Sequence, residues 1–179
     1  MSRYVRWART ERGERTRVTV TALLGPVFLV LLPLAVALGG RRIDRCLGRP
    51  PLPVGAAGRV IGGAASTFGF GLGLWSVRTQ LGRGRGTPLP LMPTQALLIS
   101  GPFVHCRNPM TLGTILAYGG LAVAARTATG LAVVMALAVS LLAYLKLLEE
   151  PELAERFGEA YLVYRRRTPF LVPRLTGRR

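Results

Sequence analysis

The chain has 179 residues, of which half are hydrophobic and 18% are charged, and its formal net charge is +16. The hydrophobic residues fall in long blocks, which excludes an ordinary soluble domain and indicates a membrane protein. The charge comes almost wholly from arginines between the blocks and at both ends, a layout that suits anionic lipid headgroups. No nucleic-acid-binding motif accompanies it, and Cys46 and Cys106 have neither disulfide-framework nor metal-ligand spacing, so we expect no nucleic-acid partner and no metal.

Two apolar blocks occupy the first half of the chain. The block at 21–40 carries no charge and is long enough to cross a hydrocarbon core, so it predicts a transmembrane helix. The arginines of the basic segment at 1–20 are typical of a topology signal. The block at 54–77 is rich in glycine, which lets helices approach closely in lipid and predicts an interior helix. Between the blocks, the arginines and adjacent prolines of 41–53 predict a short loop.

The second half predicts a loop, a membrane hairpin and an amphipathic helix. Glycine and proline interrupt the polar stretch after Trp75 every few residues, which favours a long loop. The short apolar blocks at 110–125 and 130–148 are joined by four residues and should form an antiparallel hairpin. In the last segment, side chains at helical spacing should share one face of a single helix: Leu153, Phe157, Tyr161 and Tyr164.

The predicted fold is therefore all-α, an integral membrane helical bundle of about four transmembrane helices with a C-terminal amphipathic helix. Its expected organisation is a basic segment at 1–20, two transmembrane helices at 21–79, a cytoplasmic loop at 80–109, a transmembrane hairpin at 110–148, and the amphipathic helix and tail at 149–179.

Polar residues gather in the stretch HCRNPMTLG at 105–113, directly before an apolar block. Asn108 is a favoured helix cap and Pro109 a favoured first helical residue, so we expect a helix to begin here. A helix amino terminus offers unpaired N–H groups and a positive dipole, and with Arg107 beside it the stretch is suited to bind a carboxylate. The alternative is that Arg107 contacts a lipid phosphate while Asn108 and Pro109 only start the helix.

Two acidic residues, Glu149 and Glu150, stand at the end of the last apolar block. Carboxylates at a membrane boundary are costly unless they are solvated or paired. They could pair with Arg107 or hold a cation. A ligand that carries both a carboxylate and an ammonium group, such as an amino acid headgroup, would satisfy Arg107 and the glutamates together.

Two motifs in this order resemble a known family. The runs GRGTPLPLMPTQALLISGPFVHCRNPMTLG and EEPELAERFGEAYLVYRRRTPFLVP, separated by the hairpin, are similar to the isoprenylcysteine carboxyl methyltransferase family and its bacterial homologues, which share features with phospholipid methyltransferases. The family pattern has a GTP-containing loop, an RHP or RNP sequence followed by LG, and an EExxLxxxFGxxYxxY sequence. Thr111 stands where many relatives have tyrosine, and Cys106 stands where an aliphatic residue is common.

The resemblance implies an integral-membrane methyltransferase with S-adenosylmethionine bound between the last membrane helices, the loop and the C-terminal helix. It assigns catalysis to Arg107 and Glu150. The residues that match the cofactor motif are His105, Arg107, Asn108, Pro109, Gly113, Glu149, Glu150, Phe157, Gly158, Tyr161 and Tyr164.

Within that site we expect Arg107 and the backbone at Asn108 to hold the methionine carboxylate. Glu149 or Glu150, or both, would hold the amino group, and Tyr161 or Tyr164 would line the adenosine. A substrate carboxylate could instead be positioned by Arg107 or a second arginine, Arg165 or Arg166.

The expected acceptor is lipophilic or membrane-embedded, with an isoprenoid or prenylcysteine carboxylate as the family's example. A phospholipid N-methyltransferase-like enzyme, and a non-catalytic membrane scaffold that keeps the fold, are the alternatives. The expected location is the cell membrane, multi-pass, with the cofactor site facing the cytoplasm and no obligate protein partner.

Overall fold

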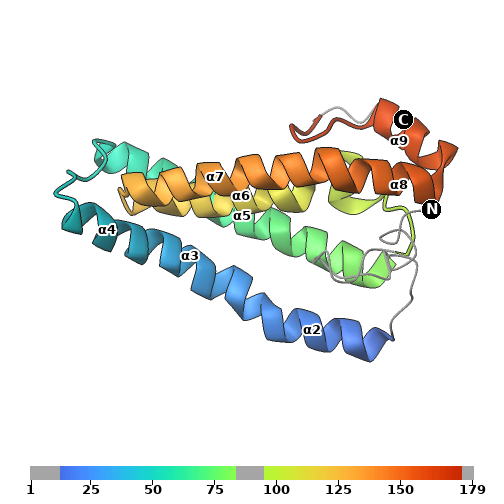
Figure 1. Ribbon diagram of the computed structural model, residues 1–179, viewed down its shortest axis with the longest axis horizontal. Coiled ribbons are helices and arrows are strands. Elements are labelled where there is room, and N and C mark those ends of the chain that lie inside the picture. The colour runs from blue at the N-terminus through green and yellow to red at the C-terminus, as the bar shows by residue number, and fades with distance from the viewer. Residues whose placement is uncertain (1–12, 84–94, 175–179) are drawn as a thin grey trace. The chain divides into compact units, whose positions relative to one another are not determined.

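The computed structural model describes residues 13–83 and 95–174, and within these ranges it contains helices and loops but no strand (Figure 1). The arginines at 3, 6, 9 and 12, the GTP sequence at 86–88 and residues 175–179 lie outside them. The prediction of an all-α membrane fold is confirmed. Among the described residues, three helices are long and apolar enough to cross a membrane: Val18–Cys46, Gly55–Arg83 and Ala128–Phe157. A shorter apolar helix covers Pro109–Ala124.

The first long helix combines α2 (Glu14–Pro26), α3 (Leu32–Leu34) and α4 (Gly40–Cys46) with two π-turns, η1 (Val27–Leu31) and η2 (Ala35–Gly39). The π-turns follow Pro26 and Pro33, whose rings disturb the regular helical hydrogen bonding. The prediction of a loop from residue 41 is wrong for 41–46, which are helical. Arginine is a good helix former, and the helix ends before Pro50 and Pro51.

The second long helix, α5 (Gly55–Arg83), extends beyond the predicted block. Residues 80–83 of the expected loop are therefore helical, because arginine, glutamine and leucine continue the helix well. Glycines on α5 allow close packing against α6 (Pro109–Ala124): a methyl group added to Gly113 would lie 2.8 Å from the carbonyl oxygen of Gly69. The glycine-rich block is thus a helix that packs closely on its neighbour.

The third long helix runs without interruption through α7 (Ala128–Tyr144), the π-turn η4 (Leu145–Glu149) and α8 (Glu150–Phe157). The prediction of one amphipathic helix from residue 149 is wrong, because 149–157 continue the membrane helix. Gly158 separates α8 from α9 (Glu159–Arg167) with a positive φ of 56°, a conformation that favours glycine. Tyr161 and Tyr164 thus lie on a different helix from Leu153 and Phe157.

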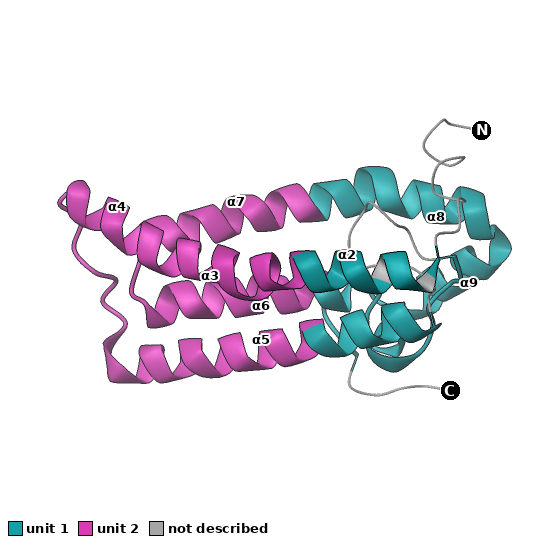
Figure 2. Cartoon of the chain, turned by 90° about the horizontal axis from the view of Figure 1, so that it is seen from below, with its two compact units in different colours: residues 1–23, 74–110, 142–179 teal, residues 24–73, 111–141 magenta. Residues whose placement is uncertain are grey.

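The chain forms two compact units (Figure 2). Unit 1 comprises residues 1–23, 74–110 and 142–179, and unit 2 comprises 24–73 and 111–141. In unit 2 the core contains Ala117, Tyr118 and Val134, and the Tyr118 hydroxyl donates a hydrogen bond to the carbonyl of Phe28.

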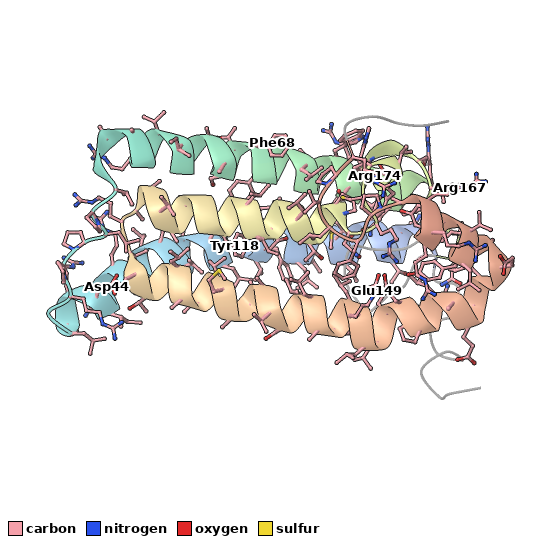
Figure 3. All side chains as sticks on the ribbon, turned by 90° about the horizontal axis from the view of Figure 1, so that it is seen from above. Asp44, Phe68, Tyr118, Glu149, Arg167 and Arg174 are labelled. Atoms are coloured by element: carbon pink, nitrogen blue, oxygen red, sulfur yellow. The ribbon has the colours of Figure 1, made fainter. Side chains whose placement is uncertain are left out.

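Unit 2 also contains a buried carboxylate, Asp44, near the end of α4 (Figure 3). It accepts hydrogen bonds from the Thr127 hydroxyl at 2.6 Å, the Thr129 hydroxyl at 2.5 Å and the Thr129 backbone N–H at 3.1 Å. Because α7 begins at Ala128, Asp44 accepts hydrogen bonds from donors at a helix amino terminus, where backbone N–H groups lack partners within the helix. The cluster joins α4 to the start of α7.

Candidate functional site

The polar stretch of unit 1 precedes α6. A short 3₁₀ helix, η3 (Gly101–Val104), leads into it, and α6 begins at Pro109, as Asn108 and Pro109 predict. Pro102, Cys106 and Pro109 are fully buried, which fixes the backbone on both sides of Arg107. Burial also raises the pKa of the Cys106 thiol, so this cysteine remains a protonated packing residue at neutral pH.

Arg107 forms an ion pair with Glu150, from its Nη1 to Oε1. Their side chains are only 10% and 7% exposed. Lys146 donates to the other carboxylate oxygen, Oε2, at 2.8 Å. Glu150 therefore has a cation on each oxygen, which offsets the cost of burying its charge.

Two tyrosines of α9 complete this side of the site. The Tyr164 hydroxyl donates to the carbonyl oxygen of Phe103 at 2.7 Å. Tyr161 is buried, and burial together with the nearby Glu150 carboxylate raises its pKa to about 12. Burial also raises the pKa of Tyr164. Both hydroxyls are neutral at physiological pH, so they can hydrogen-bond but cannot act as anionic bases.

The segment after α9 contacts the polar stretch. Pro169 accepts from the Arg107 backbone N–H at 2.9 Å, and Phe170 accepts from the Asn108 side-chain amide at 2.9 Å. His105 faces the same segment: its carbonyl accepts from the Arg174 N–H at 3.1 Å, and its Nδ1 lies 3.2 Å from the Arg174 oxygen. His105 therefore fixes the tail.

A cavity of about 60 Å³ lies beside these groups in unit 1. Its lining residues are Gln80, Leu97, Leu98, Phe103, Arg107, Asn108, Leu145, Glu149, Glu150, Leu153, Tyr161 and Tyr164. Six of the residues predicted for the cofactor site are among them. His105, Pro109, Phe157 and Gly158 are not, and Gly113 lies in unit 2, where it packs against α5.

Unsatisfied polar groups distinguish this cavity. Within the described ranges, Arg107 Nε and Gln80 Oε1 are buried without a hydrogen-bond partner. Glu149 lines the cavity from η4 (Figure 3), and none of the ion pairs among the described residues involves it. Buried donors and acceptors are normally paired, so one donor, one acceptor and one carboxylate here have capacity for a polar ligand.

The sequence did not single out Gln80, the Leu97–Leu98 pair or Phe170. Gln80 follows the apolar part of α5 as an isolated polar residue, and Phe170 lies in a proline-bounded tail. Neither position has a pattern typical of a ligand. No group of three potential metal-ligating side chains occurs in the part of the chain that is described.

A family model described as phospholipid methyltransferase matches residues 58–160, more than half of the chain. The chain belongs to the phospholipid methyltransferase family. This membership confirms the resemblance that its two motifs indicate. No curated protein and no solved structure matches the chain. Family membership and the spanning helices together indicate a membrane methyltransferase.

Proposed function

We propose that the chain transfers a methyl group from S-adenosylmethionine to a lipophilic or membrane-embedded acceptor. The observation that carries this proposal is the placement on one cavity of the Glu149 carboxylate and of Arg107 Nε, which has no partner among the described residues. A guanidinium donor and a carboxylate complement the carboxylate and the ammonium group of the cofactor's amino acid part. Gln80 offers a further acceptor for an N–H group.

The donor set fits the amino acid part of S-adenosylmethionine, whereas the cavity of about 60 Å³ accommodates only this polar end. In the proposed complex, the side chains around Tyr161 and Tyr164 move apart to receive the adenosine.

S-adenosylmethionine, when bound, supplies a methyl group on a sulfonium whose leaving group departs neutral. The protein's task is consequently to bind, align and exclude water rather than to transfer protons. Arg107 binds the carboxylate, Glu149 binds the ammonium group, and Glu150 holds the guanidinium in orientation. The leucines at 97, 98, 145 and 153 exclude water from the cavity.

The leading acceptor is an isoprenoid or prenylcysteine-like carboxylate, because the RNP and EE motifs resemble that family. Arg107, Arg165 or Arg166 would position such a carboxylate. The second candidate is a phospholipid amine, which the matching family description favours. In both cases the enzyme is a multi-pass protein of the cell membrane, and the cofactor enters from the cytoplasm.

Calorimetry with S-adenosylhomocysteine tests the cofactor assignment on detergent-purified protein. We expect the parent and the Arg78→Ala control, which removes an exposed arginine of α5, to bind equally. Folded Arg107→Ala and Glu149→Gln variants should lose most of their affinity. No binding by folded parent protein, in detergent and in lipid nanodiscs, would overturn the assignment in favour of a non-catalytic scaffold.

Radiolabelled methyl transfer to lipid extracts then separates the two acceptors. A carboxyl methyl ester releases methanol in mild alkali, whereas an N-methyl group is stable to the same treatment. Alkali-labile label would support the carboxylate acceptor, and alkali-stable label in the phospholipid fraction would support the amine.

A further inference from the structure

Lys146 is the chain's single lysine, and its position beside the proposed cofactor site has a specific consequence. It lies one helical turn before Glu150 and donates to Oε2, while Arg107 occupies Oε1. We propose that Lys146 is a positioning residue, which neutralises Glu150 so that the charge of Arg107 remains available for the cofactor carboxylate. This inference rests on the proposed function.

The charges of the cluster carry the argument. Glu149 faces the ammonium group of the ligand, and among the other charges Arg107 and Lys146 supply two positive charges against the single negative charge of Glu150, so one positive charge remains for a ligand carboxylate. Without Lys146, Arg107 and Glu150 would form a neutral pair. A ligand carboxylate would then compete with a buried glutamate for the same guanidinium, and Glu150 is costly to leave unpaired at 7% side-chain exposure.

The position of Arg107 Nε agrees with this division of roles between Glu150 and the ligand. Nη1 contacts Glu150, whereas Nε is buried and has no hydrogen-bond partner in the described ranges. A carboxylate prefers two parallel N–H donors of a guanidinium, and Nε belongs to such an edge. The ligand can therefore bind Arg107 while Glu150 keeps Nη1, provided that the charge balance remains positive.

The Lys146 side chain is 61% exposed, so solvent alone would leave it mobile. The ring of Phe170 restrains it: Lys146 Nζ lies 5.3 Å from the ring centroid, and Arg107 Cζ lies 5.5 Å from the same centroid. Cation–π attraction at these distances holds both cations near the carboxylate. Phe170 thus links the tail to the two cations that neutralise Glu150.

Binding of two ligands tests the proposal on the full chain. S-adenosylhomocysteine carries the carboxylate, whereas methylthioadenosine lacks the carboxylate and the amino group. In Lys146→Met we expect affinity for S-adenosylhomocysteine to fall about tenfold, while affinity for methylthioadenosine is unchanged. The expected loss is modest because solvent screens the charge of an exposed lysine. Lys146→Arg should restore the parent affinity, and Arg78→Met controls for the loss of one exposed cation of unit 1.

A double variant tests whether the charge balance at Arg107 is the reason for the loss of affinity in Lys146→Met. Lys146→Met combined with Glu150→Gln restores the single positive charge, so it should bind S-adenosylhomocysteine more tightly than Lys146→Met alone. Unchanged affinity in Lys146→Met, an equal loss for both ligands, or no gain in the double variant would overturn the positioning role. If the parent binds neither ligand, the proposed function itself fails, and this inference fails with it.

Discussion

Asp44, near the end of α4, and Glu150, within the third long helix, are both buried carboxylates, with 4% and 6% of their surface exposed, yet their partners differ. Asp44, in unit 2, accepts from neutral hydroxyl and backbone donors at the start of α7. Glu150, in unit 1, is neutralised by two cations, and beside it lies a guanidinium nitrogen, Arg107 Nε, that has no partner in 13–83 and 95–174. The first cluster satisfies its own groups and is structural. The second retains binding capacity, which is expected of a ligand site rather than of a structural contact.

Substitution of Arg107 has the largest expected effect on ligand binding. In Arg107→Ala the ligand carboxylate loses its donor and Glu150 loses its buried partner, so affinity for S-adenosylhomocysteine should fall at least ~100-fold. Calorimetry measures this loss. The thermal midpoint in detergent reports separately whether the variant is folded. Parent-like affinity in folded Arg107→Ala would contradict the assignment of unit 1 as the binding unit.

Substitution of Asp44 should give the opposite result. Asp44→Ala leaves the Thr127 and Thr129 donors unpaired at the amino terminus of α7, so the melting temperature should fall by roughly 5–10 °C. Affinity for S-adenosylhomocysteine, measured below the transition, should equal that of the parent. Asp44→Asn should lose less stability because it retains an acceptor oxygen. A selective loss of affinity with unchanged melting would assign a binding role to Asp44.

The two clusters also show how far sequence reasoning reaches. Local rules predicted the start of α6 at Pro109, and the opposite charges of Arg107 and Glu150 allowed their pairing to be considered. The helical extension to Cys46 was missed because Asp44 finds its partner Thr127 83 residues away. The break at Gly158 was missed because helical spacing continues across it. Lys146 pairs with Glu150 at the local i, i+4 spacing, but Phe170 contacts it from a distant segment, and no local pattern predicts that contact.

Substitution of Gly113 tests whether this glycine of the cofactor motif serves the packing of α6 against α5. Its added methyl group would meet the α5 backbone at 2.8–2.9 Å, so Gly113→Ala should reduce the free energy of unfolding by about 2 kcal/mol through overpacking. Gly71→Ala is the matched control, because a methyl group there meets nothing within 4 Å and alanine favours the helix. Chemical denaturation in mixed micelles compares the two. Equal stability of both variants would contradict the close packing of α5 and α6.

The smallest expected effect is that of substituting Gln80. The substitution tests whether the Gln80 amide accepts a hydrogen bond from the ligand or is only buried. Its Oε1 has no partner in the described part of the chain, so Gln80→Met removes an unsatisfied polar atom and should leave the melting temperature unchanged or raised. If Oε1 accepts an N–H of the cofactor, affinity for S-adenosylhomocysteine should fall about tenfold, the value of roughly one hydrogen bond to a charged group. Parent affinity combined with raised stability would restrict the polar side-chain contacts of the ligand to Arg107 and Glu149. The same variant assayed with methylthioadenosine locates the contact: a loss for both ligands assigns Gln80 to the adenosine, and a loss for S-adenosylhomocysteine alone assigns it to the ammonium group.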